Sequence, residues 1–263
     1  MLVSAPYAPL RRLPREDAEL DDEAWYGQYA EVLEALGAWR RVRMQYGYES
    51  YARAADLIGA RYAPHARLGV VRAAWADVQA LPGYRAPCLL TLPRGSVLRV
   101  GEAAGDWQKV LCLDGREGFV RGGHIGQPPE KFGELTEAIL RRRLSQSAQG
   151  YLGTPYRWGG RTPCGIDCSG LCHAAYLLNG VTIYRNARIE PGYPVREIPM
   201  GRVHVGDLLY FPGHIAMYLG QGRYIHATGH AGSDGVVINS LRKRDALYRE
   251  DLAKALLGAG SIF

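Results

Sequence analysis

The sequence predicts an α+β protein with two small all-β domains followed by a larger mixed domain. The first half repeats itself, and each copy contains short, aromatic-rich segments separated by glycine turns. The second half contains a helical run that starts at a cysteine and two strand-like segments that carry histidines. A length of 263 residues suits three domains of ordinary size.

The repeat covers residues 1–128 and has a spacing of 68 residues without a gap. Repetition of a Trp-x-x-Val motif and of several glycines indicates two copies of one module. Short strands, glycine turns and little helical periodicity predict that each copy is a small barrel. The superimposed pairs include Gly37 with Gly105, Trp39 with Trp107, Val42 with Val110, Gly47 with Gly115 and Arg53 with Arg121.

We expect the first barrel over residues 1–63 and the second over residues 64–128. Large aromatic side chains usually fill the core of such small barrels. The residues expected in the two cores are Trp39, Trp107 and Phe119.

A linker and a helix are expected over residues 129–144. Gln127-Pro128-Pro129-Glu130 is stiff because neither proline can donate a backbone hydrogen bond. Helical periodicity from Glu134 to Gln149 places leucine and isoleucine on one face. We expect the run Arg141-Arg142-Arg143 to be solvated, and the last domain to occupy residues 145–263.

Cys168 lies in Asp167-Cys168-Ser169-Gly170, directly before the helical run of the last domain. The unpaired amides at a helix N-terminus favour a thiolate, so Cys168 is a candidate nucleophile. Two strands joined by Gln221-Gly222 predict an antiparallel hairpin that brings His214 beside His226. This arrangement provides a nucleophile, a base and a group that orients the base.

The combined motifs resemble the NlpC/p60 peptidases, papain-like cysteine peptidases that cut bacterial cell-wall peptides. The resemblance covers about residues 145–263 and implies a papain-like catalytic domain for this part of the chain. The two barrels look like the bacterial SH3-like domains that often accompany it. The matching segments are Gly153-Thr154-Pro155-Tyr156, Trp158-Gly159-Gly160, Asp167-Cys168-Ser169-Gly170, Gly206-Asp207-Leu208, and His214 followed by His226-Ala227.

In the mechanism we expect, Cys168 attacks a carbonyl and His214 carries the thiol proton to the leaving amine. His226 would orient His214, and His230 is the alternative for this third position. The Cys168 backbone amide would stabilise the oxyanion. The resemblance adds the hydroxyl of Tyr156 as a second oxyanion donor.

Relatives with two such barrels look like γ-D-glutamyl-L-diamino acid endopeptidases that act on murein peptides with a free N-terminal L-alanine. The resemblance implies that the Asp-Cys-Ser-Gly motif and the segment after the helix bind the peptide. Asn186 stands where these relatives commonly carry Asp, and Glu190 adds a carboxylate nearby. The first barrel would close the amine end. The candidates are Asp167, Ser169, Arg185, Asn186 and Glu190, with Tyr48, Tyr51, Glu34 and Glu49 from the first barrel.

Composition and charge argue against several other kinds of function. The net charge is +6 and the pI is about 9.1, but the positive residues are scattered, which argues against nucleic-acid binding. Five cysteines without a Cys-x-x-Cys pair argue against a zinc site, and no cofactor is expected. Free thiols and the lack of an apparent leader or long apolar run predict a cytoplasmic protein without a membrane segment.

Three alternatives stay open at this point. The protein could be a secreted or cell-envelope hydrolase if a leader was removed. The same fold could serve an acyltransferase or amidase. Least expected is a non-catalytic wall-binding protein, since nucleophile, base and orienting group are all present. The sequence does not specify the oligomeric state.

Overall fold

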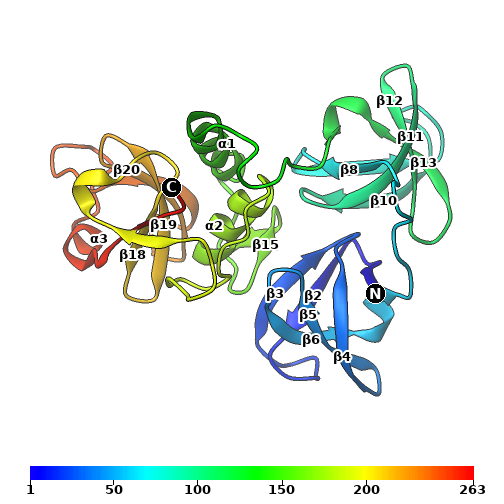
Figure 1. Ribbon diagram of the computed structural model, residues 1–263, viewed down its shortest axis with the longest axis horizontal. Coiled ribbons are helices and arrows are strands. Elements are labelled where there is room, and N and C mark those ends of the chain that lie inside the picture. Colours follow the sequence, from blue (N-terminus) through cyan, green and yellow to red (C-terminus); the bar gives the residue numbers. More distant parts are fainter. The chain divides into compact units, whose positions relative to one another are not determined.

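The computed structural model describes all 263 residues. The chain divides into two compact units, Met1–Pro128 and Pro129–Phe263, and each is described by itself. The first unit contains only strands and short 3-10 turns, whereas the second combines helices with an antiparallel sheet (Figure 1). The protein is therefore an α+β protein, as the sequence predicts.

Short antiparallel strands form the first module of the N-terminal unit. Its main sheet has the order β3-β2-β6-β5-β4, and β1 pairs with β7. The elements are β1 (Leu2–Val3), β2 (Tyr7–Arg11), β3 (Leu20–Trp25), β4 (Ala30–Leu36), β5 (Trp39–Met44), β6 (Glu49–Arg53), the 3-10 turn η1 (Ala54–Asp56) and β7 (Leu57–Ile58).

The second module repeats this arrangement in one sheet with the order β10-β9-β13-β12-β11-β8-β14. From β9 onward, its elements follow their counterparts at the 68-residue spacing to within one residue. The elements are β8 (Leu68–Val71), β9 (Trp75–Gln79), β10 (Cys88–Pro93), β11 (Val97–Ala104), β12 (Trp107–Leu111), β13 (Glu117–Arg121), the 3-10 turn η2 (Gly122–His124) and β14 (Ile125–Gly126).

Glycines explain why the turns of the two modules match. Gly37 and Gly105 have φ angles of 58° and 59° in the turns before β5 and β12. Gly47 and Gly115 have φ angles of 78° and 87° in the turns after these strands. Glycine adopts this left-handed conformation without the steric cost that a side chain would add. The repeated glycines therefore fix the same hairpins twice.

The expectation that Trp39, Trp107 and Phe119 fill the barrel cores is wrong. All three are only half-buried, and Trp107 packs edge-on against the exposed Tyr84 with ring centroids 5.2 Å apart. The core of the second module consists mainly of Val, Leu and Ala side chains. Strand alternation explains the error, because Val110 points inward and the tryptophan three residues before it lies on the other face.

The two modules share buried side chains. Tyr26 of the first module belongs to the core cluster of the second, and its hydroxyl accepts the Leu113 N–H at 2.5 Å. The Tyr26 carbonyl accepts the Val97 N–H at 2.8 Å. A Cβ atom at Gly95 would lie 2.2 Å from the Trp25 ring, so only glycine allows this close packing. The modules thus pack as one unit.

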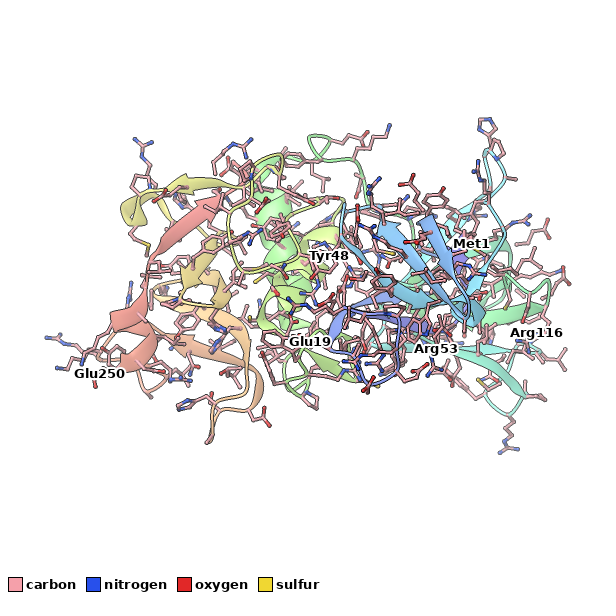
Figure 2. The ribbon with its side chains drawn as sticks, turned by 90° about the horizontal axis from the view of Figure 1, so that it is seen from below. Met1, Glu19, Tyr48, Arg53, Arg116 and Glu250 are labelled. Atoms are coloured by element: carbon pink, nitrogen blue, oxygen red, sulfur yellow. The ribbon has the colours of Figure 1, made fainter.

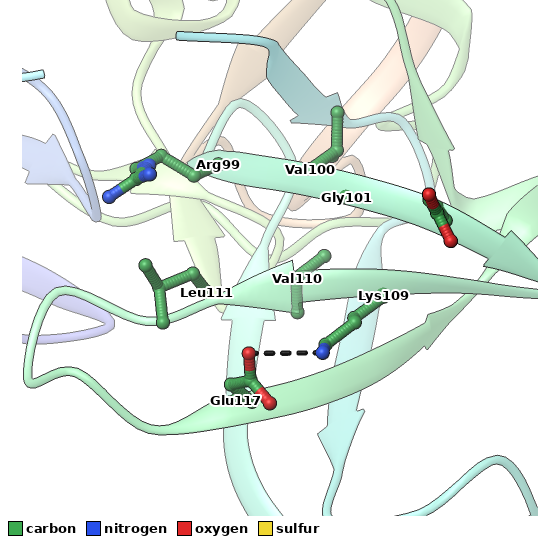
Figure 3. Close-up of a pocket in the computed structure, with 8 residues that line it drawn as sticks. Arg99, Val100, Gly101, Lys109, Val110, Leu111 and Glu117 are labelled. Carbon is green, nitrogen blue, oxygen red and sulfur yellow. Dashed lines mark ion pairs between the residues drawn. The ribbon is translucent and has the colours of Figure 1, made fainter. Parts of the chain in front are cut away.

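A shallow hollow of about 310 Å³ lies over β11, β12 and β13 of the second module (Figure 3). Arg99, Val100 and Leu111 contribute to its lining, and Lys109 pairs with Glu117 at 3.0 Å across it. The hollow contains none of the residues that the sequence predicts as substrate ligands.

The C-terminal unit is built on a six-stranded antiparallel sheet with the order β17-β22-β18-β19-β20-β21. Its strands are β17 (Arg196–Ile198), β18 (Leu208–Phe211), β19 (His214–Gly220), β20 (Arg223–Thr228), β21 (Gly235–Ser240) and β22 (Gly258–Ser261). A small hairpin and a 3-10 turn accompany the sheet: β15 (Arg161–Thr162), β16 (Gly165–Ile166) and η3 (Met200–Arg202).

Helices cover the sheet of the C-terminal unit. They are α1 (Glu137–Gln149), α2 (Cys168–Leu177) and α3 (Glu250–Ala255). Helix α2 is almost entirely buried and packs against β19 and β20. Leu252 of α3 packs with Phe211 and Tyr224 in a hydrophobic cluster. Figure 1 shows α2 and α3 on different sides of these strands.

Helix α1 differs from the sequence prediction in two respects. It begins at Glu137 and not at Glu134. Its arginine run is also not simply solvated, because Arg141 lies over the buried Asp207 carboxylate with an N–O distance of 2.8 Å. That carboxylate also accepts hydrogen bonds from the Ser261 hydroxyl and the His204 amide. A buried carboxylate needs such partners, so Asp207 fastens α1 to the sheet.

Tyr26→Ala tests the shared packing of the N-terminal modules. Removing a large buried side chain should cost about 3–5 kcal/mol of stability. Hydrogen exchange of the whole chain should show faster exchange in β8–β14, although the altered residue belongs to the first module. Tyr84→Ala is the control, because Tyr84 is 73% exposed and should leave this protection unchanged. Faster exchange confined to β1–β7 would contradict the shared packing.

Candidate functional site

Cys168 is the first residue of α2, and the preceding Asp167 caps this helix. The Asp167 carboxylate accepts the Gly170 N–H of the helix and the Gly159 N–H of the preceding loop at 2.9 Å. It also accepts the Ser169 hydroxyl at 3.1 Å. This capping arrangement holds the helix start, and therefore the cysteine, in one position relative to the loop.

Arg185 provides the charge partner of this capping carboxylate. The side chain is 1% exposed, and its Nη1 and Nη2 atoms lie 3.1 and 3.2 Å from the two oxygens of Asp167. Nη1 also donates to Ser169 Oγ at 2.8 Å, and Nη2 donates to the Gly159 carbonyl at 3.2 Å. Three predicted substrate residues, Asp167, Ser169 and Arg185, therefore bond to one another. Their contribution to substrate binding stays a prediction.

Glycines allow the loop and the helix to approach this closely. A Cβ atom at Gly170 would lie 2.4 Å from the Gly160 carbonyl oxygen. A Cβ atom at Gly160 would in turn lie 2.4 Å from the Gly165 carbonyl oxygen. Both distances are far inside van der Waals contact, so these glycines of the two sequence motifs are sterically required.

The Cys168 thiol is buried and neutral near pH 7. Burial, and to a smaller extent the Asp167 carboxylate, raises the pKa of the thiol to about 11. Hydrogen bonds from the backbone amides of Ile215 and Ser169 act in the opposite direction. The sequence argument for a preformed thiolate at the helix N-terminus is therefore corrected, because burial outweighs the favourable amides. The contact with Ile215 places the thiol beside the start of β19.

His214 and His226 lie side by side on the predicted hairpin. Strands β19 and β20 pair antiparallel, with positive φ angles at Gln221 and Gly222 in the tight turn. His214 Nε2 lies 2.8 Å from His226 Nδ1. Desolvation lowers the pKa of both imidazoles to about 4, so both are neutral near pH 7. A neutral imidazole can accept a proton.

Asn239 of β21 is the site residue that the sequence analysis missed. Its Oδ1 lies 2.8 Å from His226 Nε2, on the ring side opposite His214. Asn239 follows His226 by 13 residues and comes from the next strand. A polar residue directly after the apolar run Val236-Val237-Ile238 was the available signal.

Tyr156 lies at the Cys168 side of the site. Its backbone forms a β-bridge with Ile166. Its ring packs close to Gly229, where an added Cβ atom would lie 3.3 Å from the ring. Burial, followed by the influence of Cys168, raises the pKa of the Tyr156 hydroxyl to about 12. The phenol therefore keeps its proton near pH 7 and can donate a hydrogen bond.

The other predicted residues of the C-terminal unit lie apart from the histidine pair. His230 is exposed, and its backbone N–H, at 3.2 Å, donates to Thr228 Oγ1. The His214 contact therefore belongs to His226 and not to its rival. Asn186 is half-buried next to Arg185, and Glu190 accepts a hydrogen bond from Arg188 at 2.7 Å. The Glu190 carboxylate thus already has a cationic partner.

The candidates of the first module share neighbouring strands. Glu34 of β4 and Tyr51 of β6 both face Arg41 of β5 in the strand register. Glu49 pairs with Arg41 at 2.8 Å and with Arg43 at 2.7 Å. Figure 2 labels Tyr48, the residue directly before β6, and Arg53, the last residue of β6. Glu34, Glu49 and Tyr51 therefore lie on the same face of the sheet as Arg41.

All five cysteines are free thiols, and Cys164 is exposed whereas Cys172 is buried. The structure contains no group of three His, Cys, Asp or Glu side chains arranged to hold a metal ion. None of its helices combines the length and apolar character that crossing a bilayer requires.

Comparison with known proteins gives consistent matches. The sequence pattern of the NlpC/P60 family matches residues 153–252. The Dipeptidyl-peptidase 6 of Lysinibacillus sphaericus is 39% identical over 275 residues, which cover 100% of this chain and 99% of that protein. The Gamma-D-glutamyl-L-lysine dipeptidyl-peptidase of Bacillus subtilis is 30% identical over 117 residues, which cover 41% of this chain and 38% of that protein.

A solved structure shows the same fold over nearly the whole chain. An NlpC/P60 family protein from Bacillus cereus superimposes with a TM-score of 0.77 at 19% identity. The superposition covers 98% of this chain and 97% of the Bacillus cereus chain. The order of folds along the chain, two small β modules followed by a helix-and-sheet domain, is therefore shared with this structure.

Arg185→Met tests the charge pair at the start of α2. The change leaves the buried Asp167 carboxylate without its cation, which should cost about 3–5 kcal/mol of stability in chemical denaturation. Arg188→Met is the control on the same segment, because Arg188 is 62% exposed and pairs only near the surface. It should leave the denaturation midpoint unchanged. Equal stability of the two variants would contradict the structural role of Arg185.

The pH dependence of Cys168 alkylation tests the neutral thiol. Because only the thiolate reacts and its pKa is about 11, the rate of iodoacetamide labelling should rise about tenfold per pH unit between pH 7 and 9. Labelling of the exposed Cys164 is the internal comparison, followed by peptide mass spectrometry. A rate for Cys168 that is constant across this range would show a preformed thiolate instead.

Proposed function

The chain belongs to the NlpC/P60 family of cysteine peptidases that act on peptidoglycan peptides, and from this premise we propose a specific reaction. The protein hydrolyses the γ-D-glutamyl-L-diamino acid bond of murein peptides with a free N-terminal L-alanine. Cys168 is the nucleophile, His214 the base and His226 the residue that orients the base. The arrangement of a helix-start thiol beside a hydrogen-bonded histidine pair carries this proposal.

The chemistry follows from the neutral resting state. His214 accepts the proton of the Cys168 thiol while the sulfur attacks the γ-carbonyl carbon of D-glutamate. Proton transfer accompanies bond formation, because the free thiol is a weak acid and the buried imidazole a weak base. The C–N bond then breaks, and His214 returns the proton to the amine of the departing diamino acid.

Water completes the cycle. His214 takes a proton from water, whose oxygen attacks the thioester carbonyl. The thioester bond breaks, the L-Ala-γ-D-Glu carboxylate leaves, and the sulfur regains a proton. In both halves the carbonyl oxygen becomes an oxyanion, for which the Cys168 backbone amide and the Tyr156 hydroxyl are the proposed donors. The raised pKa of the Tyr156 hydroxyl supports this role, since it stays protonated.

The proposed specificity draws on the relatives. Release of a dipeptide, as in the name of the full-length relative, places the cleaved bond after the second residue from a free amine. The Bacillus subtilis relative that matches 41% of this chain is named for γ-D-glutamyl-L-lysine, which supports the same bond type. We propose that the amine end of the peptide is closed, and that Asp167, Ser169, Arg185, Asn186 and Glu190 contribute to peptide binding on the catalytic side. The first-module candidates Glu34, Tyr48, Tyr51 and Glu49 stay predictions.

A free-amine substrate fits a role in recycling wall fragments, so we propose that the protein works in the cytoplasm. Intact wall offers stem peptides whose amino end is joined to glycan by an amide. A closed cleft would exclude them. A secreted enzyme acting on intact wall is the alternative that the specificity test below separates.

Cys168→Ala should abolish cleavage of L-Ala-γ-D-Glu-diamino acid peptides, because no other group can form the acyl-enzyme. The measurement is product release by liquid chromatography. Cys164→Ser is the control, since this exposed cysteine lies outside the proposed mechanism, and it should keep most of the activity. Wild-type turnover by Cys168→Ala would refute the mechanism.

N-acetylation of the substrate tests the free-amine requirement. Blocking the amine should lower kcat/KM by about a hundredfold or more, because a closed amine site cannot accept the cap. The acetylated and free forms of L-Ala-γ-D-Glu-diamino acid are compared under the same conditions. Equal kcat/KM values would reject the closed cleft and favour an enzyme that acts on intact wall.

A further inference from the structure

The amide of Asn239 has one fixed orientation. Its Nδ2 atom donates to the Leu247 carbonyl at 3.3 Å, which directs Oδ1 toward His226. Oδ1 lies 2.8 Å from His226 Nε2. A carbonyl oxygen can only accept, so His226 must carry a proton on Nε2. The side chain is also well buried, with 9% of the residue exposed, so water competes little for this contact.

This contact determines the tautomers of both histidines. A neutral imidazole has one N–H, so a proton on Nε2 leaves His226 Nδ1 as an acceptor. The His214 Nε2 atom, 2.8 Å away, must then be the donor. His214 in turn keeps its lone pair on Nδ1. The chain from Asn239 through His226 therefore leaves one defined nitrogen of His214 free to accept a proton.

We propose that Asn239 is a positioning residue that sets this tautomer chain and thereby presents Nδ1 of His214 as the base. The inference rests on the proposed function of Cys168 and His214, but the tautomers themselves can be observed without substrate. Asn239 acts through His226 and does not touch the reacting atoms. An asparagine also orients the pair without adding negative charge, so both imidazoles can stay neutral.

Other side chains around His214 and His226 either pack against the two imidazole rings or influence their pKa values by charge. The ring centroids of Phe211 in β18 and His214 lie 5.7 Å apart, and those of Tyr224 in β20 and His226 lie 5.1 Å apart. From the α3 segment, the Arg249 charge lowers and the Asp251 charge raises the pKa of both histidines. Arg249 and Asp251 pair with each other at 2.6 Å, so their opposite effects partly cancel.

Kinetics of two Asn239 variants test the proposal. Asn239→Leu removes the acceptor at similar volume and should lower kcat about 10- to 100-fold, with KM changed less than about twofold. Asn239→Asp keeps an acceptor at the same place and should retain kcat within about threefold at pH 8. Its carboxylate favours the charged imidazoles, so the acid limb of kcat/KM should move up by about one pH unit.

Asn179→Leu is the matched control. Asn179 is equally buried, at 7% exposed, and its amide bonds to Ser147 and to the Ala175 carbonyl, away from the histidines. This variant should lose stability but keep the wild-type kcat. Combining Asn239→Leu with His226→Ala should lower kcat less than about twofold beyond His226→Ala alone. Full additivity of the two losses would overturn action through His226.

Nitrogen-15 NMR of the histidine rings reads the tautomers directly in the Cys168→Ala protein. We expect both His214 and His226 to carry their proton on Nε2, and Asn239→Leu to produce a tautomer mixture at His226. A proton on Nδ1 of His226 with Asn239 intact would overturn the inference. So would wild-type kcat in Asn239→Leu. If the wild-type protein cleaves none of the peptides, the proposed function fails, and the NMR result alone decides the role of Asn239.

Discussion

The buried Asp167 carboxylate is the interaction on which the site depends. It caps α2, holds the Gly159 loop and pairs with Arg185. A buried charge of this kind is tolerated only when its oxygens are satisfied, so the loop and the helix start cannot move independently. Cys168 directly follows this anchor. The position of the nucleophile is thus a consequence of satisfying one carboxylate.

The second half of the site depends on neutral hydrogen bonds instead of charge. Burial keeps the thiol protonated and both imidazoles unprotonated near pH 7. The hydrogen bonds from Asn239 to His226 and from His226 to His214 then decide which ring nitrogen of His214 can accept a proton. The charged pair of Asp167 and Arg185 at the start of α2 fixes the position of the nucleophile. The neutral hydrogen bonds on the sheet side orient the base.

Local patterns predicted much of this arrangement. The hairpin with His214 and His226 follows from alternating residues around a Gln-Gly turn, and the repeated glycines predicted two matching β modules. The features that the sequence did not predict depend on packing between segments that are distant along the chain. The contact of Asn239 depends on the register of β21 after an intervening loop, and the burial of Arg141 depends on Asp207 in a different element. Trp39 and its counterpart in the second module were assigned to the cores from size alone, whereas strand alternation decides which face is inside.

Trapping the covalent intermediate tests the central claim most directly. The wild-type protein is mixed with L-Ala-γ-D-Glu-diamino acid peptide, quenched in acid within milliseconds, and examined by intact-protein and peptide mass spectrometry. The account predicts an L-Ala-γ-D-Glu adduct held as a thioester on Cys168. An adduct on another residue, or one that carries the diamino acid half of the substrate, would contradict the assignment of the nucleophile or of the cleaved bond.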